Sequence, residues 1–75
     1  MNAERRKRLA QTCELISEAR TLLQDIFDEE EEAFDNLPEN FQISERGEQM
    51  EEAIEIMGDV GDMLDDCQSQ LEDIC

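Results

Sequence analysis

The second half of the chain decides the fold, and residues 50–74 read MEEAIEIMGDVGDMLDDCQSQLEDI. Apolar residues recur in this stretch at alternating spacings of three and four, at Met50, Ala53, Met57, Val60, Leu64, Cys67, Leu71 and Ile74. Because an α-helix turns once every ~3.6 residues, this spacing places these side chains along one edge of a helix. An apolar edge of this length has to be buried, so the stretch predicts a coiled-coil-like helix with a helical neighbour.

The first half of the chain predicts another long helix, which begins after Asn2 and ends near Phe34. Asparagine is a good N-cap because its side-chain oxygen can accept a hydrogen bond from an unpaired backbone N–H. The positions expected to be buried are Leu9, Ile16, Ala19, Leu23, Ile26 and Ala33, flanked by Leu15, Leu22, Phe27 and Phe34. This stripe is wider than a two-stranded contact requires, so we expect this helix to contact more than one neighbour.

A loop over about residues 35–43 separates the two helices. Pro38 disfavours helical geometry at Leu37, and the aspartate and asparagine residues around it favour turns. Ser44 is a natural N-cap for the second helix, which is expected over about residues 44–74. So short a connection makes the two helices antiparallel neighbours.

The expected register aligns residues whose numbers sum to about 80. In that register Cys13 lies near Cys67, and the basic residues 5–8 lie near Glu72 and Asp73. The predicted fold is therefore one all-α domain over residues 1–75, an antiparallel helical hairpin that dimerises into a four-helix bundle.

The seam of this fold is expected at Leu9, Ile16, Leu23, Ile26, Met50, Met57, Val60, Leu64 and Leu71. An aspartate in such a seam would be an unpaired buried charge. Ile16→Asp or Leu64→Asp is therefore expected to dissociate the dimer. Gly58 and Gly61 interrupt the second helix and leave two interpretations open. Each glycine is a weak spot or slight bend that costs about 1 kcal/mol relative to alanine, or Gly61 permits another helix to approach closely.

The composition argues against an enzyme and against a metal or cofactor site. The chain has no histidine, tryptophan or tyrosine, and its three cysteines follow no zinc-binding spacing. An odd number of cysteines also argues against a secreted disulfide framework. No glycine-rich phosphate loop and no nucleophile with an adjacent base is found. No apolar run is long enough for a membrane span, and the expected location is cytoplasmic.

Charge is distributed unevenly along this acidic chain, whose net charge is -16. Residues 1–8 carry a net +3, and residues 9–75 carry a net -19. The acidic cluster Asp28–Glu32 ends the first helix, where each exposed carboxylate opposes the helix dipole by about 0.3–1 kcal/mol. The expected partner-binding acidic face consists of this cluster and part of the second helix: Asp28, Glu29, Glu30, Glu31, Glu32, Glu52, Glu55, Asp59, Asp62 and Asp66.

Two functional hypotheses follow. The first is a non-enzymatic protein–protein interaction module that acts as a small homodimeric bundle. The second is an acidic nucleic-acid mimic that inhibits a host DNA- or RNA-binding protein, because carboxylates three or four positions apart on a helix recur every ~5–6 Å. The acidity also has a simpler interpretation, a solvated surface that keeps the chain in solution. The charge opposes direct nucleic-acid binding.

Three segments of the chain resemble small uncharacterised proteins of bacterial phages and integrated mobile elements. They are residues 34–40 (FDNLPEN), residues 44–48 (SERGE) and the basic start over residues 4–9 (ERRKRL). The similarity covers nearly the whole chain. It implies an acidic helical hairpin with a phage-related role, including the inhibition of a host defence system. It implies no assigned activity.

Overall fold

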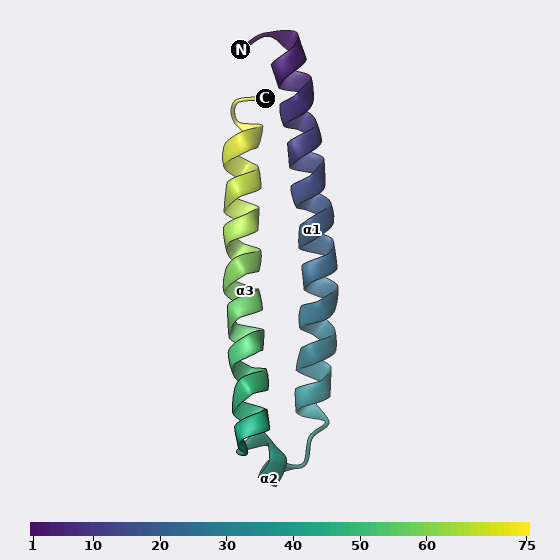
Figure 1. Cartoon of the computed structure of the whole chain (residues 1–75), viewed down its shortest axis with the longest axis vertical. Helices are drawn as coiled ribbons and strands as arrows, with labels where there is room; N and C mark the ends of the chain where they lie inside the picture. The colour runs from purple at the N-terminus through teal and green to yellow at the C-terminus, as the bar shows by residue number, and fades with distance from the viewer.

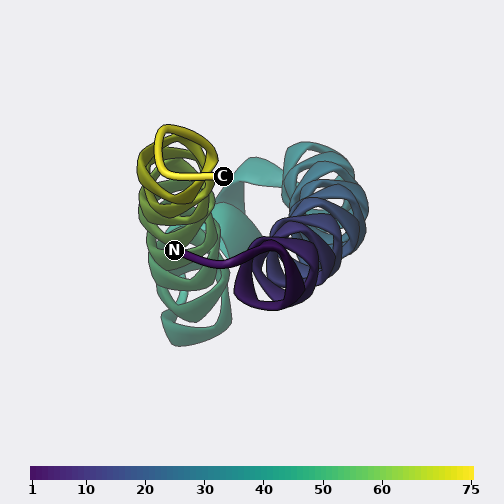
Figure 2. The ribbon, with the colours of Figure 1, turned by 90° about the horizontal axis from the view of Figure 1, so that it is seen from above.

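The computed structural model describes all 75 residues and contains three helices and no strand. Helix α1 spans Ala3–Asp35, α2 is a single turn over Glu39–Gln42, and α3 spans Glu45–Glu72. Figure 1 shows α1 and α3 side by side in opposite directions, with α2 at the turn between them. The Cα atoms form a rod of 58 × 15 × 13 Å. Seen from above in Figure 2, the two long helices make a single layer, and no third element covers either broad side.

Both N-caps expected from the sequence are present. The side chains of Asn2 and Ser44 accept hydrogen bonds of 2.8 and 3.4 Å from the backbone N–H three residues later. Each bond satisfies one of the N–H groups that the start of a helix leaves unpaired. The expected loop differs in one respect, because residues 39–42 form α2 directly after Pro38. Pro38 is the N-cap of this turn, and its carbonyl oxygen accepts hydrogen bonds from the backbone N–H groups of Phe41 and Gln42.

The contact between α1 and α3 repeats every seven residues along both helices. On α1 its apolar members are Leu9, Cys13, Ile16, Leu23, Phe27 and Phe34. On α3 they are Met50, Ile54, Met57, Leu64 and Leu71. Only Cys13 is a buried apolar residue, with 7% of its surface exposed. One helix pair therefore leaves nearly every side chain in this contact partly accessible to water.

The contact is rotated relative to the stripe predicted from the sequence. On α1, three residues expected to be buried are exposed: Ala19, Ile26 and Ala33. On α3, the same holds for Ala53, Val60 and Cys67. In each case the following residue faces the other helix instead. One residue along an α-helix corresponds to a rotation of about 100°. Half of the contact positions shift by one residue and the other half do not, so the mean direction of the contact rotates by about 50° on each helix.

Side-chain packing explains this rotation. Each apolar stripe is wider than one helix can cover, so the pair buries the part that packs best. The rotation brings Phe27 and Phe34 into the contact, and the Phe27 ring lies where Gly58 has no side chain. An added Cβ at Gly58 would lie 3.5 Å from this ring, at ordinary van der Waals distance. The rotation also carries Arg20 toward Asp65 on α3.

The register of the two helices also differs from the prediction. Arg20 lies beside Asp65, and Phe27 lies beside Gly58, so contacting residue numbers sum to 85 rather than about 80. The cause is the geometry of the turn. Figure 1 shows that α2 and the start of α3 extend past the end of α1, which displaces α3 along the rod.

Because of this change in register, two contacts that the sequence predicted at the open end of the hairpin do not form. Cys13 lies close to Cys75 and not beside Cys67. The first turn of α1 projects past the end of α3 (Figure 1). The basic residues 5–8 therefore make no ion pair with their expected partners, Glu72 and Asp73.

Gly47 occupies a position that no other residue fits. An added Cβ would overlap the carbonyl oxygen of Gln42 and lie 2.6 Å from that of Phe41, because α3 starts directly against the turn. Gly61 is different, since nothing lies within 4 Å of an added Cβ there. No segment of the same chain therefore requires a glycine at Gly61 for close approach.

We expect Gly47→Ala to lower the free energy of unfolding by about 1–3 kcal/mol, because the new methyl group overlaps a backbone carbonyl. Gly61→Ala is the matched control on the same helix. It is expected to raise the free energy of unfolding by about 1 kcal/mol, since alanine favours a helix and finds open space. Urea unfolding followed by circular dichroism measures both. A gain for both variants would contradict the overlap at Gly47.

Candidate interaction surfaces

Each long helix carries a second apolar stripe that the chain itself leaves exposed. The stripe on α1 consists of Leu15, Ala19, Leu22 and Ile26. The stripe on α3 consists of Ala53, Ile56, Val60, Met63 and Cys67. Large side chains are involved, since Leu15, Leu22 and Met63 expose 66%, 62% and 60% of their surface. We call these nine residues the apolar face.

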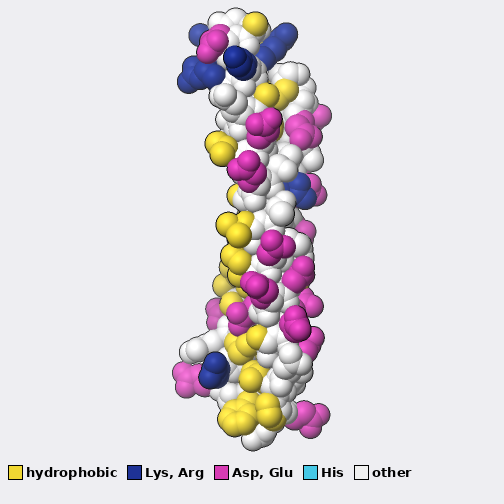
Figure 3. Space-filling view, turned by 90° about the vertical axis from the view of Figure 1, so that its right-hand side faces the viewer, with side chains coloured by type: hydrophobic (Ala, Val, Ile, Leu, Met, Phe, Trp, Pro, Cys, Tyr) yellow, Lys and Arg dark blue, Asp and Glu magenta, His cyan; other side chains and the backbone are white.

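Both stripes lie on the same broad side of the rod. Every residue of the apolar face directly precedes a residue that faces the other long helix. In antiparallel helices this offset turns both stripes to one side, and the register sets Leu22 level with Met63. Figure 3 shows apolar side chains along one edge of the view, whereas acidic side chains occupy the middle and the opposite edge.

The opposite broad side is polar and contains a groove of ≈ 780 Å³ between the helices. On α1 it is lined by Ser17, Thr21 and Gln24. On α3 it is lined by Glu55, Gly58, Asp59, Asp62 and Asp65. Four carboxylates along one wall give this acidic groove a negative potential.

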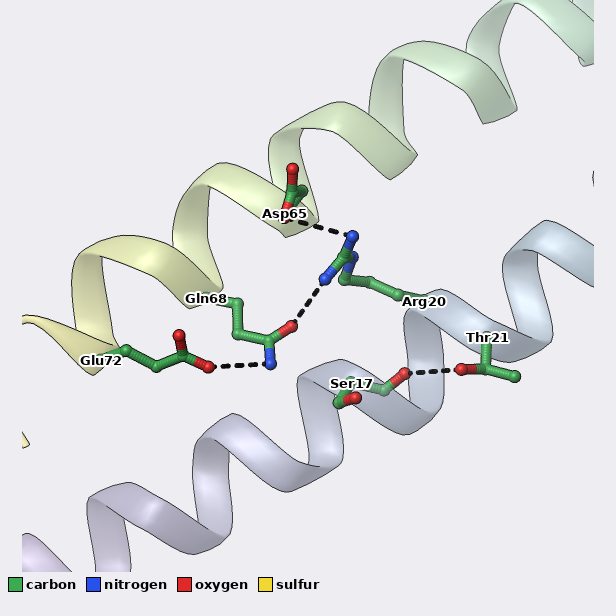
Figure 4. Close-up of polar contacts among 6 residues, drawn as sticks. All are labelled: Ser17, Arg20, Thr21, Asp65, Gln68 and Glu72. Atoms are coloured by element: carbon green, nitrogen blue, oxygen red, sulfur yellow. Dashed lines mark hydrogen bonds and ion pairs between the residues drawn. The ribbon is translucent and has the colours of Figure 1, made fainter.

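Arg20 crosses from α1 to α3 at this groove (Figure 4). Its guanidinium lies 3.2 Å from the Asp65 carboxylate and donates a hydrogen bond of 2.9 Å to the side-chain oxygen of Gln68. Gln68 donates in turn to Glu72, at 3.1 Å. The arginine and aspartate side chains are 37% and 62% exposed, so the ion pair contributes no more than about 1 kcal/mol. Its main effect is on register, because sliding the helices would break both contacts of Arg20.

The acidic residues predicted to bind a partner do not gather into one surface. Three of them border the acidic groove: Glu55, Asp59 and Asp62. Two are exposed elsewhere on α3: Glu52 and Asp66. The cluster Asp28–Glu32 consists of consecutive residues, which a helix turns to different sides. Glu30 is half-buried toward α3, and its four neighbours in the cluster are exposed.

The predicted seam residues divide between two places. Ile26 and Val60 are 43% and 37% exposed and belong to the apolar face. The others lie between the two long helices: Leu9, Ile16, Leu23, Met50, Met57, Leu64 and Leu71.

Sequence reasoning missed the contact of Arg20 with Asp65 and Gln68. One signal was available, because Arg20 is the only basic residue between Arg8 and Arg46. A single cation in a long acidic chain predicts an acidic partner nearby. The register between α1 and α3 decides which carboxylate lies beside Arg20, and the geometry of the turn sets that register.

All three cysteines are free thiols, and no group of three or more histidine, cysteine, aspartate or glutamate side chains is arranged to hold a metal ion. No helix combines the length and the apolarity that a membrane crossing requires. No protein-family model, curated protein or solved structure matches the chain. The apolar face and the acidic groove are therefore the features from which a function has to be argued.

Cys13 sits in a setting that favours the neutral thiol. Burial raises the pKa of Cys13 above its ordinary value of 9.0. Interactions with the neighbouring Cys75, and then the negative charge of Glu72, raise it further. Because the thiolate is the reactive form, Cys13 is a poor nucleophile at neutral pH.

We expect the free energy of unfolding to fall as the pH rises above 9.0, the value of an unperturbed cysteine. A group with a raised pKa in the folded state stabilises fully below its unfolded pKa, and this contribution is lost as pH rises through the folded pKa. Cys13→Ala should make the decline shallower, and the absence of tyrosine keeps the background small. Urea titrations from about pH 8 to 10.5 measure this effect. Equal slopes for both proteins would show that Cys13 contributes nothing.

Proposed function

We propose that this chain is a non-enzymatic protein–protein interaction module that works as a dimer, with two hairpins packed through their apolar faces into a four-helix bundle. One observation carries the proposal. On both helices the centre of the apolar stripe points about 50° away from the neighbouring helix, and on both it turns to the same side.

That angle is the one a four-helix bundle requires. In a square bundle each helix has two neighbours at right angles, so the bundle centre lies about 45° from either neighbour. A two-helix hairpin requires instead that the stripe point straight at its partner. The residues that the hairpin leaves uncovered, such as Ile26 and Val60, then become central core positions of the bundle.

The lack of a core in the single hairpin supports the same proposal. Only two residues of the isolated chain are buried, so the hairpin has little core of its own. A chain of this size commonly gains stability by associating with a second copy.

We expect the natural chain to sediment as a dimer, and Leu22→Asp or Met63→Asp to give the monomer mass of 8.7 kDa. Each aspartate would place an unpaired charge in the new core, at a cost of several kcal/mol (roughly 2–7). Thr21→Asp is the matched control, because Thr21 adjoins Leu22 in sequence but lines the acidic groove. Analytical ultracentrifugation measures all four proteins. A natural chain that stays monomeric at micromolar concentration would contradict the proposal.

Ile16→Asp and Leu64→Asp are less suitable for this test. Ile16 and Leu64 lie between α1 and α3 of the same chain. An aspartate at either position would disrupt the hairpin itself, and loss of the dimer would follow from unfolding. Leu22 and Met63 are exposed in the single chain, so their replacement separates association from folding.

A second function, mimicry of nucleic acid, is favoured by the lack of internal charge pairing. Of 22 acidic side chains, only Asp65 has an ion-pair partner. The acidic groove and the dimer face lie on opposite sides, so pairing through the apolar face leaves the groove free. A phage-related role, which the resemblance of residues 34–40 and 44–48 implies, would make a host DNA- or RNA-binding protein the target of this surface.

Mimicry predicts capture of a basic, nucleic-acid-binding protein from a bacterial lysate, with release at high salt and competition by added DNA or RNA. Glu55→Lys with Asp62→Lys should abolish this capture. Glu29→Lys with Glu32→Lys is the control, since it reverses as many charges away from the acidic groove. Binding that resists both salt and nucleic acid would exclude mimicry and leave the interaction module unaffected.

A further inference from the structure

We infer that the two copies pair head to tail, with the turn of each hairpin beside the chain termini of the other. The inference rests on the proposed dimer, and the occupant of the apolar face is a second copy of this chain. Two arrangements bury both apolar faces with twofold symmetry. Either the turns lie at the same end of the bundle, or they lie at opposite ends.

The charge at the two ends of the rod separates these arrangements. The first two turns of α1 carry Arg5, Arg6, Lys7 and Arg8 against Glu4, a net of +3. None of these cations has an ion-pair partner in its own chain. The turn carries Asp35, Glu39, Glu45 and Glu48 against Arg46, a net of -3. Figure 3 shows the basic group at one end of the rod and acidic side chains toward the other.

Only the head-to-tail arrangement brings oppositely charged ends of the two copies together. With both turns at one end, the two basic segments would lie together, as would the two acidic turns, and both pairings are repulsive. With the turns at opposite ends, each basic segment lies beside an acidic turn. Opposite charges at the rim of an interface set its orientation more than its affinity.

The positions of the basic segment and of the acidic turn along the rod fit a twofold axis through the centre of the apolar face. This centre lies near residue 24 of α1, between Leu22 and Ile26. Arg8 is sixteen residues before it, or about 24 Å along the helix. In the register of the hairpin, the start of α3 at Glu45 is level with a point on the axis of α1 about five residues beyond its end at Asp35. That point is about 24 Å from the centre on the other side. Rotation about the centre therefore brings each basic segment to the partner's turn.

The test is a distance measurement between two spin labels in the dimer. One nitroxide label is attached to each chain through Asn40→Cys, in a background that carries Cys13→Ala, Cys67→Ala and Cys75→Ser. Double electron–electron resonance is expected to report a separation of about 50 Å, since each turn lies about 24 Å from the centre. Turns at the same end would bring the labels within about 20 Å, the width of two packed helices.

Sedimentation of the same labelled sample distinguishes two failures. A dimer with the short distance overturns the head-to-tail arrangement and leaves the proposed dimeric module standing. A monomer overturns both. The charge argument is tested by adding Arg6→Glu and Arg8→Glu to the labelled chain, which should convert part of the long distance to the short one. The control Arg46→Glu, which makes the turn more acidic, should leave the long distance unchanged.

Discussion

The number of neighbours available to each helix governs the rest of this structure. A helix with one neighbour can bury one side of an apolar stripe and has to expose the other side. Both helices here carry stripes that are too wide for a single neighbour, and Cys13 alone among their apolar side chains becomes buried. The apolar face consists of the parts of the two stripes that the neighbouring helix does not cover. Because the helices are antiparallel, both uncovered parts lie on one side of the rod.

Features that depend on a few consecutive residues could be predicted from the sequence. The N-caps at Asn2 and Ser44 are local, because a cap needs only its own side chain and a backbone N–H three residues later. Seam positions such as Ile16 and Leu64 lie between the two long helices, because they fall on the contact in either orientation of the helices. The error of about 50° in direction arose because an apolar pattern locates the centre of a stripe, whereas the contact depends on which neighbours are present.

Features that depend on contacts distant in sequence could not be predicted. The register follows from how α3 starts against the turn, where Gly47 meets the backbone carbonyls of Phe41 and Gln42. That contact has no signature in composition or spacing. The acidic groove depends on the same register, so the sequence identified the carboxylates by type but not which of them share a surface. Glu30, half-buried within an acidic run, shows the limit of counting charges along a helix.

With the proposed dimer, the scarcity of buried residues in a single hairpin would tie the lifetime of this protein to its abundance. If folding depends on a second copy, the fraction of folded chains rises with total concentration. Chains made in small amounts would remain open and be degraded by proteases, and chains made in a burst would survive by finding one another. The proposed dimer would thus set a threshold concentration, below which synthesis of the chain yields little folded protein.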